Sequence, residues 1–253
     1  MFNRQFSVIL FAQKRVTEKM KKLIITFGVF TLIFASCGRT SNATTFDEGV
    51  VINGVRWATS NVDAPGTFAE NPESWGMLFQ WNRKKGWCSL ALFEIISNCP
   101  DYEGLERWEC LEALEYYIDK LLVDWDSTYA IGTKWYAEND PCPAGWRVPT
   151  KEELQKLVDA GSEWATQNGV NGRFFGTAPY QIFLPAMGYR SGSYGDLSDV
   201  GIWGEYWSST QEYVRDYTMW GWNLSFGSDN ISRWNIVPNL RAQGRSVRCV
   251  AIE

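Results

Sequence analysis

The alternation of apolar and polar positions along the chain predicts short β-strands joined by turns. Two apolar runs, Val50–Ile52 and Val55–Trp57, flank Asn53-Gly54, and Asn-Gly is the strongest two-residue signal for a β-hairpin. We therefore predict a hairpin over residues 50–57. Further short strands are predicted between Gly-rich loops at 77–81, 182–184, 206–209, 222–226 and 247–252.

Two segments have a helical period instead. Thr150 precedes Glu153 by three residues, which is the spacing of a capping box, and Gly161 gives the following helix its end. Apolar residues from Leu105 to Trp125 recur every three or four positions, which predicts an amphipathic helix with a core-packing stripe. The pattern as a whole predicts an α+β fold with short antiparallel strands, two or three helices and long Gly/Trp-rich loops.

The N-terminal segment is typical of a targeting signal. Lys21-Lys22 precedes an apolar run, Leu23–Ala35, that is too short for a comfortable membrane span. The run ends in small residues before Cys37, an order that resembles the signal of bacterial lipoproteins, in which the cysteine is lipidated. A plain secretory signal with a chance cysteine is the alternative. A leader of this kind would naturally start at Met20.

This interpretation divides the chain into a leader (1–36), a tether (37–47) and a folded domain (48–253). The lipid on Cys37 would be the connection to a membrane, and the protein would reside in the cell envelope. We expect an outer-membrane lipoprotein that faces either the periplasm or the cell surface. Both locations remain open on the sequence.

Charge and composition exclude several classes of function. Removal of residues 1–36 leaves 18 basic and 28 acidic residues, a net charge of −10, which argues against a nucleic-acid partner. The chain contains no histidine, which excludes Ser-His-Asp and Cys-His catalysis and imidazole metal ligands.

Five cysteines follow Cys37, and an oxidising compartment would favour disulfides among them. We favour a bond between Cys142 and Cys249, with a second bond among the other three. An odd number leaves at least one cysteine free or bonded between chains. The alternative is that all five are buried thiols. The other three are Cys88, Cys99 and Cys110.

The chain holds 14 tryptophans, which either fill a modest core or offer rings to a ligand. Core packing is the more common role, but four of them lie among Gly-rich loops and are the candidate ligand-binding residues. A calcium site at three loop carboxylates is less favoured than plain solvation, and no cofactor is expected. The tryptophans are Trp203, Trp220, Trp222 and Trp234, and the carboxylates are Asp196, Asp199 and Glu205.

Several long motifs follow one another along the chain: Val51–Val62, Gln80–Arg83, Asn139–Thr150, Asn168–Arg173, Phe183–Arg190, Tyr206–Thr210 and Gly244–Val250. In order and in register they resemble the Fibrobacter succinogenes major paralogous domain, which is common in lipoproteins of gut and oral Bacteroidota. The resemblance covers about residues 48–252 and implies that the segment at about 88–123 is a helical insertion.

The family is distantly similar to C-type-lectin-like domains, in which the terminal strands pair. That broad fold includes sugar binders, adhesin tips and formylglycine-generating enzymes, so the fold alone does not decide the function. We expect a non-enzymatic envelope lipoprotein that binds a glycan or an envelope protein. A structural or pilus-associated component is the alternative. An enzyme is disfavoured because the reactive cysteine pair of formylglycine-generating enzymes cannot be located.

Overall fold

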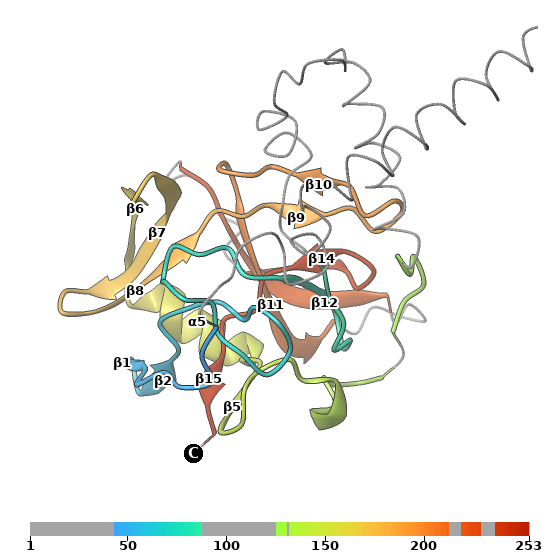
Figure 1. Ribbon diagram of the computed structural model, residues 1–253, viewed down its shortest axis with the longest axis horizontal. Coiled ribbons are helices and arrows are strands. Elements are labelled where there is room, and N and C mark those ends of the chain that lie inside the picture. Colours follow the sequence, from blue (N-terminus) through green and yellow to red (C-terminus); the bar gives the residue numbers. More distant parts are fainter. Residues whose placement is uncertain (1–42, 88–124, 131, 213–218, 229–235, 253) are drawn as a thin grey trace, which may run out of the picture. The chain divides into compact units, whose positions relative to one another are not determined.

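The structure, a computed structural model, describes residues 43–87, 125–130, 132–212, 219–228 and 236–252 (Figure 1). Contacts divide the chain into two units, and every described residue belongs to the unit Ser41–Ser89 with Trp125–Glu253. The predicted leader, Cys37, the helix predicted over 105–125 and the cysteines of that segment lie outside the described residues.

The described residues are β-rich, with short antiparallel sheets, one α-helix and one 3-10 helix. The sheets have the strand orders β1-β2-β15-β5, β10-β9-β14-β3-β4, β11-β12-β13 and β6-β7-β8. The helices are η1 (Ala137–Asn139) and α5 (Lys151–Asp159). The strands are β1 (Val50–Ile52), β2 (Val55–Trp57), β3 (Leu78–Gln80), β4 (Gly86–Trp87), β5 (Trp146–Arg147), β6 (Ser162–Gln167), β7 (Val170–Thr177), β8 (Tyr180–Pro185), β9 (Tyr189–Arg190), β10 (Leu197–Ser198), β11 (Gly204–Gln211), β12 (Trp220–Phe226), β13 (Ile236–Leu240), β14 (Gly244–Arg245) and β15 (Val250–Ala251).

The predicted N-terminal hairpin is confirmed and pairs with the C-terminal strand. Asn53 and Gly54 both have positive φ, at 46° and 77°, as a tight two-residue hairpin turn requires. Val250 of β15 lies opposite Trp57 of β2, so the two ends of the described chain meet in one sheet, as Figure 1 shows. The strand β15 is shorter than the predicted 247–252, because Val247 and Cys249 bond to the irregular loop after β2 instead.

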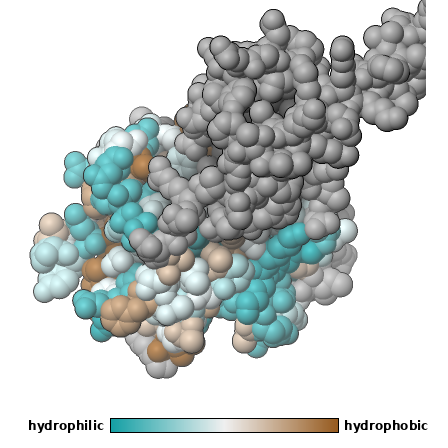
Figure 2. All heavy atoms as spheres, in the orientation of Figure 1, coloured by the Kyte–Doolittle hydropathy of each residue, from teal (hydrophilic) through white to brown (hydrophobic). Residues whose placement is uncertain are grey.

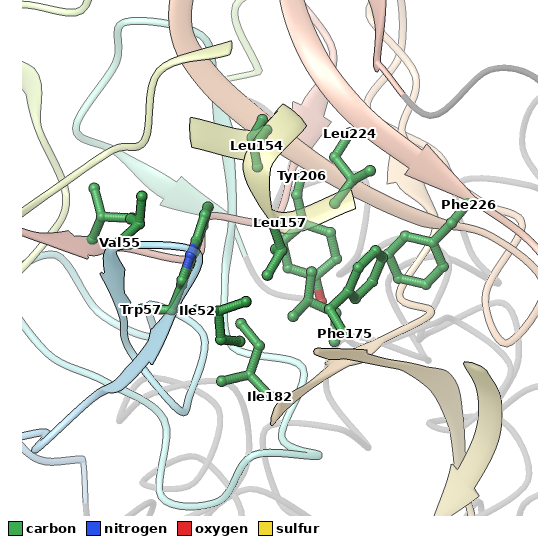
Figure 3. Close-up of a cluster of buried hydrophobic side chains, with 12 residues drawn as sticks. Ile52, Val55, Trp57, Leu154, Leu157, Phe175, Ile182, Tyr206, Leu224 and Phe226 are labelled. Carbon is green, nitrogen blue, oxygen red and sulfur yellow. The ribbon is translucent and has the colours of Figure 1, made fainter. Parts of the chain in front are cut away.

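Helix α5 begins and ends where its sequence predicts. The Thr150 hydroxyl accepts the backbone N–H of Glu153, whose carboxylate accepts the N–H of Thr150 in return. Gly161, at φ +81°, follows the last turn. Leu154 and Leu157 are fully buried and pack, as Figure 3 shows, into a core built by the hairpin and the central strands.

A second core surrounds the disulfide. Cys142 and Cys249 are bonded, with Cα atoms 6.1 Å apart across 107 residues, so this predicted bond is confirmed. The core includes Trp81 and Trp207, both fully buried, and the Trp207 indole N–H donates to the Phe79 carbonyl at 2.7 Å. Much of the tryptophan content therefore fills the interior.

Eight described strands and one boundary differ from the sequence prediction. The strands β4, β5, β9, β10 and β14 are only two residues long, and the polar and glycine residues of β6, β7 and β13 hide the alternation. Asn168-Gly169 turns β6 into β7 with positive φ at both residues, 48° and 82°. Within the predicted tether, Thr44 already exchanges backbone hydrogen bonds with Phe68.

Candidate functional site

Two of the four candidate tryptophans form a strip on β12. Trp220 and Trp222 are two residues apart on a strand, so their side chains lie on one face of the sheet, and both are half-buried. Their cross-strand partners in β13 are Leu240 and Pro238. The result is a small, partly exposed apolar surface, which we call the β12 strip, comprising Trp220, Trp222, Pro238 and Leu240.

The β12 strip lies on the same face of the sheet as the buried core residues of β12. Further along β12, Leu224 and Phe226 on the same face are buried in the core with Leu154 of the helix. The first helical residue, Lys151, places its Nζ 3.2 Å from the centroid of the Trp222 ring. A cation on one face of Trp222 fixes that ring, while Trp220 lies two residues further from the core.

The other two tryptophans do not join this strip. Trp203 immediately precedes β11, whose first residue, Gly204, pairs with Phe226 at the far end of β12 from Trp220. Six residues of strand separate the two ends, which is roughly 20 Å. Trp234 lies outside the described residues. The strand predicted at 222–226 is confirmed but begins two residues earlier, so Trp220, which was expected in a Gly-rich loop, belongs to β12 as well.

A cationic depression lies on the surface at the turn between β3 and β4. It has a volume of about 400 Å³. Its lining contains three cationic residues and no carboxylate, unlike the acidic chain as a whole. The lining residues are Asn82, Arg83, Lys84, Lys85, Ala130, Tyr136 and Asn139.

Side-chain contacts hold the walls of the depression in place. Arg83 pairs with the carboxylate of Asp126 and donates to the Thr128 hydroxyl at 3.0 Å. Asn82 has a positive φ of 56°, and its side-chain oxygen accepts the backbone N–H of Tyr136 at 2.8 Å. The β3–β4 turn, the segment 126–130 and η1 are thereby joined around one depression.

Arg241 connects one wall of the depression to the backbone at the start of β12. Its Nε donates to the Trp220 carbonyl at 3.1 Å, and its Nη1 donates to the Ala130 carbonyl at 3.0 Å. The guanidinium also lies 3.8 Å from the centroid of the Trp81 ring. Burial lowers the pKa of Arg241 to about 10. The start of β12 and one wall of the depression are therefore neighbours, held by the same side chain.

A second depression, of about 390 Å³, has the opposite charge, with Asp47, Glu48 and Glu70 in its lining. Asp47 is used for structure, because its carboxylate accepts the backbone N–H groups of Gly49 at 2.8 Å and Thr59 at 2.7 Å. Among the described residues, no group of three or more Asp, Glu or Cys is arranged to hold a metal ion.

The three carboxylates weighed as a calcium site have separate local roles. Glu205 is buried and accepts hydrogen bonds from Arg245 at 3.2 Å and from the Ser225 hydroxyl at 2.9 Å. Asp196 accepts the Ser191 hydroxyl. Asp199 occupies a turn at φ +61°.

Sequence reasoning missed the cationic depression. The sequence feature that could have indicated it is the run Arg83-Lys84-Lys85, in a chain with more acidic than basic residues. The partners of this run, Ala130, Tyr136 and Asn139, are about fifty residues away, and only the fold brings them together. Figure 2 shows hydrophilic and hydrophobic residues side by side on the visible face of the described part of the chain.

Comparison with known proteins identifies no relative of the chain. No protein family, curated protein or solved structure matches the chain. Within the described part of the chain, no helix has the length and apolar character needed to cross a membrane.

Proposed function

We propose that this protein is a non-catalytic binding module of the cell envelope whose ligand is a glycan. The observation that carries the proposal is the β12 strip, in which two half-buried indoles share one strand face at the surface. Sugar rings present apolar C–H faces that pack on aromatic rings, and their hydroxyls need polar groups close by. The Lys151 ammonium, 3.2 Å from the centroid of the Trp222 ring, is one such polar group.

The strip is suited to binding because its rings are held before a ligand arrives. Lys151 covers one face of Trp222, and Pro238 opposes this tryptophan across the sheet. A side chain already fixed by its surroundings loses little conformational entropy when it binds. Trp220, nearer the surface end of the strip, is the residue expected to contact the sugar.

The envelope location, the family and the lectin-like fold belong to the same proposal. The apolar run that ends at Cys37 supports lipid attachment. The motifs over 48–252 support membership of the Fibrobacter succinogenes major paralogous domain family. Pairing of the terminal strands β2 and β15 supports a C-type-lectin-like fold. The membrane partner would be reached through the lipid alone.

An assembly role and an enzymatic role are the competing functions. A structural or pilus-associated component would use the same surface to dock an envelope protein. A formylglycine-generating catalyst would need a reactive cysteine pair. Cys142 and Cys249 are bonded to each other, so such a pair would have to come from outside the described residues.

The test is glycan binding by the mature chain, residues 37–253, in detergent. We expect binding to some members of a panel of plant, mucin and bacterial glycans, and loss of about tenfold or more in affinity for Trp220→Ala. Tyr180→Ala is the matched control, because Tyr180 is an exposed aromatic residue (67 %) at the turn between β7 and β8. Silence across the panel would reject the glycan ligand.

A further inference from the structure

We propose that the outer edge of β6 pairs with the β6 edge of a second copy of this chain, so that the protein self-associates through a continuous β-sheet. Strand β6 is the outer strand of the sheet β6-β7-β8, as Figure 1 shows. The inference goes beyond the proposed function and uses a different sheet from the β12 strip. It is argued from the backbone groups of β6, from the other sheet edges and from the residue pairs that self-pairing creates.

The outer edge of β6 carries hydrogen-bonding groups that the described fold does not use. In an antiparallel pair, alternate residues direct their backbone groups toward the partner strand and away from it. The Gly176 N–H donates to the Gly161 carbonyl at 3.0 Å, and Gln167 pairs with Val170 around a two-residue turn, so the odd-numbered residues of β6 face β7. The outward N–H and C=O groups, which have no backbone partner among the described residues, belong to Ser162, Trp164 and Thr166.

The other sheet edges in the described part of the chain are short, interrupted or covered, which are the usual protections against edge pairing. Strand β13 contains Pro238. The Trp207 N–H of β11 donates to the Ser246 carbonyl, and the Phe183 carbonyl of β8 accepts the Arg248 guanidinium. The edge strands β1, β4, β5 and β10 are two or three residues long. Strand β6 has six residues without proline or lysine, so it is the long edge that lacks these protections.

The sequence of β6 is complementary to itself when a twofold axis passes through Trp164. Trp164 then lies opposite its own copy, and Ser162 lies opposite Thr166 of the second copy. Each of these pairs joins outward backbone groups on both strands and can exchange two hydrogen bonds. Glu163, the only charged residue of β6, lies opposite Ala165 of the second copy, so no like charges face each other.

The alternative registers are less favourable. An axis at Glu163 places the two carboxylates directly opposite each other, which destabilises a strand pair. An axis at Ala165 places Ser162 opposite Asn168, which belongs to the turn and not to the strand. The axis at Trp164 also brings two indoles together, and aromatic cross-strand pairs are stabilising. Trp164 already packs against the main core, which holds its ring in place.

Self-association of this kind is weak in solution and gains strength at a membrane. A single strand pair makes a small contact, of the size found in transient complexes. Chains anchored in one membrane through Cys37, as proposed above, are held at a high effective concentration. A pair of chains would present two β12 strips to a glycan of repeated sugar units, which raises avidity. This last step rests on the proposed function, whereas the strand pairing does not.

The experiment measures self-association of the mature chain, residues 37–253, by sedimentation velocity in detergent. The free thiols are alkylated beforehand, so that disulfides between chains do not contribute. We expect a reversible equilibrium between monomer and dimer that shifts toward dimer as the protein concentration rises. A chain that stays monomeric up to about 1 mM would overturn the inference.

A pair of variants at one position tests the register. Ala165→Glu places a carboxylate opposite Glu163 of the second copy, twice in each dimer, and should weaken the dimer about tenfold. Ala165→Lys places an ammonium there and should leave the dimer at least as tight as wild type. Ala137→Glu and Ala137→Lys make the same charge changes at an exposed alanine of η1 and should each shift the dissociation constant less than about twofold.

Hydrogen–deuterium exchange locates the contact. Exchange over residues 162–166 should slow as the concentration rises, because the outward amides of β6 become bonded, and exchange over residues 137–139 should not change. Protection elsewhere with none over β6 would overturn the inference, and so would equal effects of the two Ala165 variants. Neither result bears on the glycan panel or on Trp220→Ala, so failure of this inference is distinguishable from failure of the proposed function.

Discussion

Arg248 donates two hydrogen bonds to the side-chain oxygen of Asn61, which lies 187 residues earlier in the chain, at 3.0 Å from Nε and 2.8 Å from Nη2. Both residues are fully buried. The same guanidinium donates to the carbonyl oxygens of Thr59 and Phe183. Burial lowers the pKa of Arg248 to about 10. One side chain thus joins the loop after the hairpin, strand β8 and the C-terminal segment.

Replacement of Arg248 should be among the most damaging single changes in the described domain. Arg248→Met leaves the Asn61 oxygen and several buried carbonyls without a donor, and we expect a loss of about 3–5 kcal/mol in the free energy of unfolding. Urea denaturation followed by tryptophan fluorescence measures it. Arg56→Met, at an exposed arginine of β2, is the control and should change stability by less than about 1 kcal/mol. A similarly small loss of unfolding free energy for Arg248→Met would show that its hydrogen bonds do not hold the three segments together.

The disulfide should contribute much of the domain's stability. It spans 107 residues, and the chain-entropy account gives about 4–5 kcal/mol for a loop of that size. We expect Cys142→Ala/Cys249→Ala to unfold at a markedly lower urea concentration than wild type. A mass spectrum of the non-reduced digest should contain the 142–249 cross-link. Its absence from protein exported to an oxidising compartment would contradict the bond.

The capping box should stabilise α5 and, through Leu154 and Leu157, the main core. Thr150→Ala removes the acceptor for the Glu153 backbone N–H, and losses at such positions are about 1 kcal/mol. Thermal unfolding measures the change. Thr177→Ala, at an exposed threonine of β7, is the matched control and should leave the melting temperature nearly unchanged. Equal effects of the two substitutions would show that the cap is not formed.

Glu153 should make part of the stability depend on pH. Burial raises the pKa of Glu153, but hydrogen bonds and charge attraction from Arg147 and the hydrogen bonds with Thr150 outweigh it, and the pKa is lowered overall. Because the folded pKa lies below the unfolded value of about 4.3, this stabilisation is present above that pH and is lost as the pH falls through the folded pKa.

Glu153→Gln tests this dependence by urea denaturation at pH 7 and pH 3. The variant should be less stable than wild type at pH 7, and the difference should shrink as the pH falls toward 3, because protonation of the wild-type carboxyl removes the same interaction. The exposed neighbour Glu152 supplies the control Glu152→Gln, for which we expect a small difference at both pH values. A difference that stays constant with pH would contradict the role given to the Arg147–Glu153 pair.

Local signals in the sequence predicted local structure well. Asn53-Gly54 predicted the hairpin, and the spacing of Thr150, Glu153 and Gly161 predicted α5, because these interactions form within a few residues. Asn168-Gly169 carries the same hairpin signal, but its flanking strands β6 and β7 alternate too weakly to be found from pattern alone. The number of strands was therefore underestimated.

The candidate site was only partly accessible to sequence reasoning. Tryptophans were the right residue type, yet sequence position did not tell Trp207, which is fully buried, from Trp220, which is half-buried. Trp203 and Trp220 were grouped because both lie near glycines. The antiparallel pairing of β11 and β12 places them at opposite ends of one sheet.

The sequence by itself determined the turns, the helix limits, the acidic character and the exclusion of histidine chemistry, because each depends on residue identity or on neighbours a few positions away. The tertiary structure alone decided which tryptophans line the surface and which distant residues surround the run 83–85. It also placed the Arg248 guanidinium against carbonyl oxygens of two other segments, the loop after the hairpin and strand β8. These relationships depend on strand pairing between residues far apart in the chain, and a linear pattern does not encode which strands will meet.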